Sequence, residues 1–368
     1  MRSITYLLLS ILLIAAFLSK ANDFEDAEGF VILDTAAVQA EEETYLDGDW
    51  TEINSSDCAG AGQLLPTVNR ESFVHFSKVQ EAWHYADMAY KRQFRPDHKQ
   101  DIFEAELAKG TSITFFGDNQ GIVFTKKCGS LVVAYQGTTN LNDLMTDLSF
   151  RGYYSQKTGL SGHSGFLKRY EQTKDQLFLI LESIAQAQGK KLIDLDLLFT
   201  GHSLGGALAQ IAAADATINH QLGSELITFA APRALSVTSV EDALLTNRII
   251  NPVRIVSKYD YVHGILPEFL TGYRGLGTKI TVGSLSDINQ RYNPASAHKM
   301  GDYALNLPEL ESSIASSVYK GETVEGCLNL SRYMKEDSYL RLARTVVHRY
   351  GENPVLFVLS WVSGGWLS

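Results

Sequence analysis

The stretch from Leu195 to Gln210 constrains the fold more than any other part of this sequence. It joins a short apolar run to the pentapeptide Gly201-His202-Ser203-Leu204-Gly205, and an alanine-rich run that favours a helix follows. A G-x-S-x-G turn between a strand and a helix forms an elbow that exposes the serine hydroxyl at the top of a sheet. The glycines on both sides lack bulk, so that the strand and the helix can approach closely. The stretch therefore predicts Ser203 as a nucleophile.

Strands and helices alternate around this elbow, and the pattern predicts the fold class. Apolar residues at helical spacing predict helices over Phe73–Tyr90 and Tyr170–Gln188. Short apolar runs between turn residues predict strands over 111–116, 121–125, 131–135, 225–230, 253–257 and 279–282. This alternation is typical of an α/β protein with a mostly parallel central sheet and helices on both faces. We expect one such domain over residues 67–310.

The N-terminal part of the chain predicts export. Met1-Arg2, the apolar run Ile4–Leu18 and the small residues before position 22 are typical of a signal peptide over residues 1–21. The apolar run is shorter than the roughly 20 residues that a membrane-spanning helix needs. We therefore expect a periplasmic or secreted protein, with membrane association as an alternative.

Most of the negative charge lies in a leader, and the ends of the chain differ from its middle. The net charge is −10, yet residues 22–57 hold twelve acidic side chains and no Lys or Arg. Residues 22–66 are therefore interpreted as a flexible acidic leader. Residues 311–368 are interpreted as a helical C-terminal extension without an assigned role, with an amphipathic helix over Lys335–Arg349 and an apolar run at Val355–Trp361.

Several classes of protein and site are excluded. Cys58, Cys128 and Cys327 are widely spaced and form no C-x-x-C pair, which argues against a cysteine zinc site or a disulfide-dense scaffold. One disulfide bond remains open, and the spacing does not choose its pair. No phosphate-binding loop or dinucleotide fingerprint follows a predicted strand, and no basic stripe carries interleaved aromatic residues. We expect no cofactor, no metal and no nucleic-acid partner.

A serine nucleophile needs a base that accepts its proton and a third group that holds the base. In hydrolases with this elbow, an acidic residue and then a histidine follow the serine, each on a loop after a strand. Asp260 comes just after the strand Val253–Ser257, and a residue that caps a turn is the alternative for it. Of the nine histidines, His298 has the position that this order requires. Ser203, Asp260 and His298 are the predicted catalytic residues.

The oxyanion of such a reaction needs two hydrogen-bond donors. One is the backbone N–H of the residue after the nucleophile, Leu204. The strand Leu131–Tyr135 leads into Gln136-Gly137-Thr138, where the Thr138 N–H and hydroxyl are both suitable donors. Thr138 and Leu204 are therefore the predicted oxyanion hole.

Four separated motifs make the chain resemble the class 3 lipases, the fungal triacylglycerol-lipase-like branch of the α/β-hydrolases. The motifs lie at residues 132–138, 201–206, 228–233 and 254–260. The spacing from His298 to Tyr303 and the stretch His163–Phe166 agree with the resemblance, which covers about residues 83–303. It implies the same catalytic and oxyanion residues that the spacing predicts.

The chain departs from the family pattern at three positions, and the resemblance also implies a lid. Gln136, Leu144 and Ala230 stand where the family commonly has Arg, Trp and Gly. The lid is expected after the oxyanion loop, where one apolar helical face is formed by Leu141, Leu144, Met145 and Leu148. Such a face would contact a lipid surface, and a helix packed on the body is the alternative.

The sequence as a whole predicts a serine hydrolase that cleaves carboxylic ester bonds of lipids, such as those of triacylglycerol or another acylglycerol, through an acyl-enzyme. A phospholipase A1 and a non-lipid carboxylesterase of the feruloyl-esterase kind remain alternatives, because they share the triad. A binding module with an inactive hydrolase fold is the non-enzymatic alternative. The expected partner is a lipid or another ester, and the sequence assigns no oligomeric state.

Overall fold

The computed structural model describes residues 73–94, 103–118, 120–138, 151–258, 260, 262–264, 268–283, 296–314, 318–319, 322–323 and 327–329. The predicted signal peptide, acidic leader and lid face lie outside these ranges. The helix expected over Lys335–Arg349 and the apolar run Val355–Trp361 lie outside them too. The domain boundaries therefore stay predictions.

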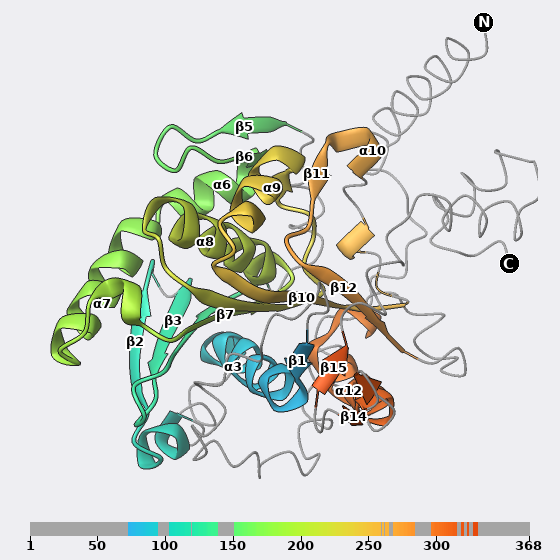
Figure 1. Ribbon diagram of the computed structural model, residues 1–368, viewed down its shortest axis with the longest axis horizontal. Helices are drawn as coiled ribbons and strands as arrows, with labels where there is room; N and C mark the ends of the chain where they lie inside the picture. Colours follow the sequence, from blue (N-terminus) through green and yellow to red (C-terminus); the bar gives the residue numbers. More distant parts are fainter. Residues whose placement is uncertain are drawn as a thin grey trace, which may run out of the picture. The chain divides into compact units, whose positions relative to one another are not determined.

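The central sheet has seven strands in the order β12-β10-β8-β7-β4-β3-β2 (Figure 1). Its strands are β2 (Ser112–Phe116), β3 (Gly121–Thr125), β4 (Leu131–Tyr135), β7 (Leu197–His202), β8 (Ser224–Phe229), β10 (Ile249–Ser257) and β12 (Thr278–Val282). Four of the six pairings are parallel, and β2 and β3 add an antiparallel edge. The prediction of a mostly parallel central sheet is confirmed.

β4 and β7, in the middle of the sheet, are mostly apolar because both of their faces are covered. Every residue of β4 and of β7 is buried. Strands buried on both faces appear in a sequence as continuous apolar runs rather than as alternating patterns. This explains why β3 and β4 begin and end at the residues that the sequence predicts.

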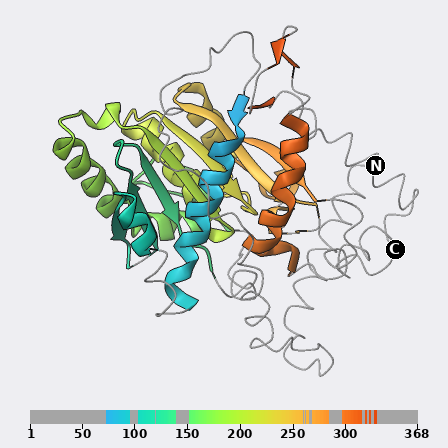
Figure 2. The same cartoon turned by 90° about the horizontal axis from the view of Figure 1, so that it is seen from below.

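Helices cover both faces of the sheet, as the sequence predicts. On one face lie α3 (Phe76–Phe94) and α12 (Met300–Ile314), which run side by side (Figure 2). The other face is covered by α6 (Ser164–Glu171), α7 (Lys174–Ala187), α8 (Leu204–Asn219) and α9 (Val237–Leu245) (Figure 1). Each face has its own cluster of buried apolar side chains. The two clusters alternate along β4, because successive residues of a strand point to opposite faces.

A second, antiparallel sheet was not predicted from the sequence. It has the order β11-β9-β6-β5, and its strands are β5 (Gly152–Tyr154), β6 (Ser161–His163), β9 (Leu235–Ser236) and β11 (Tyr273–Arg274). None of these strands exceeds three residues, which is too short for an alternating pattern to be recognised.

Both ends of the described chain differ from the prediction. The helix expected from Phe73 begins at Phe76, because β1 (Phe73–His75) pairs with β15 (Cys327–Asn329). Residues 318–329, predicted to be helical, contain β13 (Val318–Tyr319), β14 (Glu322–Thr323) and β15. The prediction of a helical extension is therefore wrong for these strands. No helix in the described ranges is long and apolar enough to cross a membrane.

Candidate active site

Ser203 lies at a strained turn between β7 and α8. Its backbone has φ 56° and ψ −126°, a conformation that residues other than glycine rarely adopt. The Ser203 N–H donates to the Phe229 carbonyl at 3.0 Å, which ties the turn to the end of β8. A Cβ on Gly201 would lie 2.5 Å from the Gly205 carbonyl, and a Cβ on Gly205 would lie 2.1 Å from the Tyr135 carbonyl. The glycines are required by this close approach, as the sequence predicts.

The structure brings Ser203, His298 and Asp260 together. The His298 Nε2 lies 2.9 Å from the Ser203 Oγ, and the His298 Nδ1 lies 2.9 Å from the Asp260 Oδ2. Asp260 follows β10, and His298 ends the short helix η6 (Ser296–His298). All three side chains are buried. A serine, an imidazole and a carboxylate in this order form the hydrogen-bond chain that activates a serine hydroxyl.

Asp260 is held in a polar pocket that favours its ionised form. Its Oδ2 also accepts from the Tyr303 hydroxyl at 2.7 Å, and its Oδ1 accepts from the Val262 N–H at 2.8 Å. Burial alone raises the pKa of Asp260, but His298, His263 and the Tyr303 hydroxyl outweigh burial and hold the pKa below its ordinary value. Asp260 is therefore a carboxylate that can orient His298 and stabilise its charged form.

The two predicted oxyanion donors lie on segments that touch each other. Leu204 is the first residue of α8, whose N-terminus directs free backbone N–H groups toward Ser203. Gly205 of the elbow lies against the backbone of Tyr135, at the end of β4, and of Gln136, where the loop after β4 begins. Thr138 follows in that loop and is half-buried. This arrangement is suited to receive a developing negative charge beside Ser203.

Two further histidines lie near this centre. The His202 ring is buried, with its centroid 4.7 Å from that of His298. His263 lies in η5 (Val262–Gly264), and burial lowers the pKa of its ring to about 4. Among the hydrogen bonds of the described residues, the Ser203 hydroxyl pairs with His298 and with neither of these two rings. The sequence places His202 in the elbow, and it predicted no contact between His202 and His298.

Other side chains of the site could not be identified from sequence spacing. The Tyr303 hydroxyl accepts from the Ser257 N–H at 2.9 Å as well as donating to Asp260. The His298…Tyr303 spacing was the only sequence signal for Tyr303, and that spacing assigns no role.

Gln136 is buried, and its Nε2 has no hydrogen-bond partner within the described ranges. No group of three or more His, Cys, Asp or Glu side chains in those ranges is placed to hold a metal.

The fold and the strained elbow together define an α/β-hydrolase. Residues 132–269 match the family model described as "Lipase (class 3)". The resemblance that the four motifs predict is thereby confirmed.

Relatives with known names agree with this family. The chain is 30% identical over 173 residues to a lipase of Rhizopus niveus and to a lipase of Rhizopus oryzae, covering 45% of this chain and 42% of each relative. The chain therefore spans less than half the length of these two relatives.

Two solved structures are similar in fold. The lipase of Rhizopus microsporus var. chinensis is 23% identical, with a TM-score of 0.48 over 59% of this chain and 78% of that chain. Lipase II of Rhizopus niveus is 25% identical, with a TM-score of 0.48 over 58% of this chain and 84% of that chain.

Proposed function

We propose that this protein is a serine hydrolase that cleaves carboxylic ester bonds. The observation that carries the proposal is the unbroken hydrogen-bond chain from Ser203 through His298 to Asp260. The strained backbone of Ser203 adds to it, because such strain persists only where the surrounding structure enforces it. A binding module without activity would have no need of either feature.

The geometry supports a two-step reaction. The Ser203 Oγ attacks the ester carbonyl while the His298 Nε2 accepts its proton, and the Thr138 and Leu204 donors stabilise the oxyanion. Asp260 stabilises the imidazolium that forms, and His298 then protonates the leaving alcohol. Water, activated by His298, attacks the acyl-enzyme, so that the acid is released and Ser203 regains its proton.

The substrate class that we propose is an acyl ester of a lipid, such as an acylglycerol. The match of residues 132–269 to the class 3 lipase family supports it, and so do the two Rhizopus relatives that are named lipases. A phospholipase A1 or a non-lipid esterase would share the same triad. Rates on emulsified and on dissolved monomeric esters distinguish a lipase, which prefers the emulsion, from an esterase.

We also propose that the protein is exported, as the predicted signal peptide implies. Cys128 is disulfide-bonded, and disulfide bonds persist mainly in oxidising compartments such as the periplasm and the extracellular space. We expect the mature protein to be found in the medium or the periplasm. N-terminal sequencing is expected to show that it begins after Ala21.

Labelling with a fluorophosphonate probe tests the proposed activity, since the probe reacts only with an activated serine. We expect stoichiometric labelling that is abolished in Ser203→Ala. The matched control is Ser224→Ala, which removes a buried hydroxyl without a hydrogen-bond partner in the described ranges. A folded wild-type protein that is not labelled would exclude the proposed activity and favour the binding module.

A further inference from the structure

The His202 side chain has no part in the two-step reaction, yet both of its ring nitrogens are bonded beside the triad. Its Nε2 lies 2.6 Å from the backbone carbonyl of His298, and its Nδ1 lies 2.7 Å from the Tyr90 hydroxyl. A carbonyl oxygen only accepts, so Nε2 must carry the proton. The neutral ring therefore donates to His298 and accepts from Tyr90, and its two partners assign the tautomer.

Tyr90 extends this contact to the loop that holds the oxyanion donor. It lies in the last two turns of α3, and its hydroxyl is also 3.3 Å from the His202 carbonyl. A Cβ on Gly137 would lie only 1.8 Å from the Tyr90 hydroxyl oxygen. The phenol is therefore packed against the backbone of Gly137, next to Thr138.

Three segments that are far apart in the sequence meet at this pair of side chains. The loop of Gly137 holds one oxyanion donor, the elbow holds the nucleophile, and η6 holds the base. We propose that Tyr90 and His202 are positioning residues, which fix the backbone of His298 and the loop at Gly137 relative to Ser203. The inference rests on the proposed function, because it assigns both residues to the same reaction.

The charge of His202 suits this role. Burial and, to a smaller extent, the nearby His298 lower the pKa of His202 to about 3, although Asp260 opposes them. The groups that face the ring are His298, Asp260, Tyr90 and Tyr303. A neutral ring adds no positive charge next to His298 when His298 becomes an imidazolium. A cation at that distance would oppose the proton transfer.

The side chain that replaces His202 decides whether the contact with His298 survives. His202→Leu fills a similar volume and removes both hydrogen bonds. His202→Gln retains an amide N–H that can reach the His298 carbonyl. If the role is positional, the first variant loses reactivity and the second recovers most of it.

The measurement is the rate of fluorophosphonate labelling of the full chain at several probe concentrations. The limiting rate depends on proton transfer from Ser203 to His298, and the half-saturating concentration reports probe binding. We expect His202→Leu to lower the limiting rate by roughly 10- to 100-fold, with half-saturation changed less than about 2-fold. His202→Gln is expected to return to within about 5-fold of the wild-type rate.

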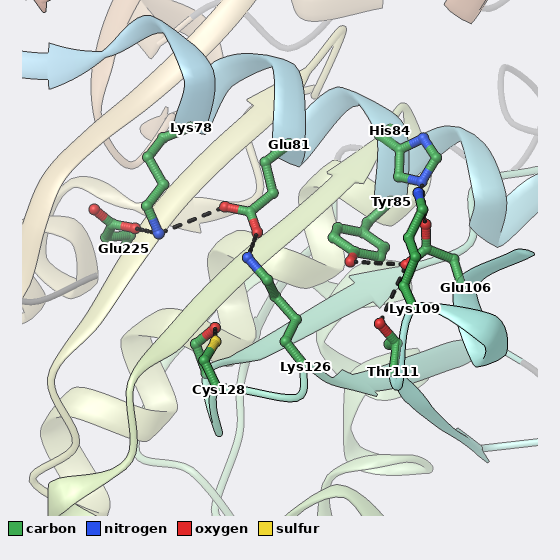
Figure 3. Close-up of polar contacts among 11 residues, drawn as sticks. Lys78, Glu81, His84, Tyr85, Glu106, Lys109, Thr111, Lys126, Cys128 and Glu225 are labelled. Carbon is green, nitrogen blue, oxygen red and sulfur yellow. Dashed lines mark hydrogen bonds and ion pairs between the residues drawn. The ribbon is translucent and has the colours of Figure 1, made fainter. Parts of the chain in front are cut away.

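Tyr90→Phe is a milder variant that decides the question if His202→Leu does not fold. We expect its limiting rate to fall by roughly 5- to 10-fold, because the His202 Nδ1 loses its donor. The matched control is Tyr85→Phe, on the same helix. The Tyr85 hydroxyl donates to the Glu106 carboxylate at 3.2 Å (Figure 3) and forms no hydrogen bond to Ser203, Asp260 or His298. The control is expected to label at the wild-type rate.

The outcomes separate this inference from the proposed function. If the wild type is labelled and Tyr90→Phe and His202→Leu match its limiting rate, the positioning role is wrong while the hydrolase proposal stands. An increase in the half-saturating concentration alone would also overturn it, because binding would then be the quantity affected. A folded wild type without labelling overturns both.

Discussion

The hydroxyl of Tyr303 connects the acid of the triad to the backbone of its own loop. It donates to the Asp260 carboxylate and accepts from the Ser257 N–H, so its removal leaves two buried groups with one partner fewer. Tyr303→Phe is expected to destabilise the fold by about 1–3 kcal/mol and to lower the turnover rate. Thermal unfolding and ester hydrolysis measure the two effects.

Tyr303→Phe is also expected to change the pH dependence of the activity. The folded state lowers the pKa of Asp260, so this carboxylate stabilises the protein above its ordinary pKa, and the contribution is lost as the pH falls through the lowered value. Without the hydroxyl the pKa of Asp260 rises, and the acid limb of activity moves to higher pH. Tyr153→Phe, whose hydroxyl donates to Glu171, is the control. An unshifted acid limb in Tyr303→Phe would contradict the role of this bond.

Ala230 has a backbone conformation that favours glycine. Its φ is 53°, in the left-handed region, although its side chain is fully buried. This conformation costs an alanine about 1–2 kcal/mol. Ala230→Gly is therefore expected to leave the free energy of unfolding unchanged within about 1 kcal/mol, whereas Ala212→Gly, in the buried interior of α8, should lose at least about 1 kcal/mol. Equal losses in the two variants, measured by denaturant unfolding, would show that φ at Ala230 carries no strain.

Among single residues, chain order identifies those that chemistry requires, and the fold decides the rest. Ser203, Asp260 and His298 can be predicted because each follows a strand in a fixed order. The contact of Tyr90 with His202 cannot be predicted, because it joins residues 112 positions apart through the packing of α3 on the sheet. Tyr90 appears in the sequence only as one of the apolar positions of a helix.

At the scale of elements, the difference between long and short segments has a physical cause. Almost every residue of β3, β4 and α8 is buried, so that the continuous runs of apolar or small residues in the sequence predict these elements. The helix predicted over Tyr170–Gln188 is wrong as a single element, because α6 ends at Glu171 and α7 begins at Lys174. The Thr173 hydroxyl donates to the Tyr170 carbonyl at the break, a local side-chain bond that competes with a continuous helix.

The segment after α3 is attached to it through one buried carboxylate, Glu106. The Glu106 carboxylate accepts from His84, Tyr85, Lys109 and Thr111, and Figure 3 shows these side chains converging on it. Burial alone raises the pKa of Glu106, but the bonds from His84 and Lys109 lower it to about 2. The carboxylate therefore stabilises the fold above its ordinary pKa of 4.5, and this contribution is lost as the pH falls from there toward 2.

Glu106→Gln tests this attachment. At pH 7 the variant is expected to lose about 1–3 kcal/mol of stability, because an amide cannot satisfy four donors. Near pH 2 its stability should approach that of the wild type. Thermal unfolding between these pH values measures the difference, and Glu104→Gln, at an exposed position of the same helical segment, is the control. A pH-independent difference would contradict the ionised state of Glu106.

At the scale of the whole molecule, the disulfide bond of Cys128 links stability to redox conditions. Cys128 lies in the turn between β3 and β4, beside an ion pair of Lys126 with Glu81 at 2.6 Å (Figure 3). A disulfide bond typically contributes about 2–4 kcal/mol. We expect reductant to lower the melting temperature of the wild type and to leave that of Cys128→Ser unchanged. Cys58→Ser and Cys327→Ser identify the partner of Cys128: the melting temperature of the variant that lacks the partner should also be unaffected by reductant. If reductant lowered the melting temperature of all variants equally, a structural disulfide would be excluded.

The pairing of β1 with β15 joins segments separated by about 250 residues, and this separation has a consequence for biosynthesis. While the ribosome is still adding the sheet strands, the edge of β1 has no partner, and α12 lacks the strand that contacts it. This part of the architecture can therefore form only after β15 has been synthesised. A chain that stays incompletely folded until late in synthesis is compatible with the export that we propose.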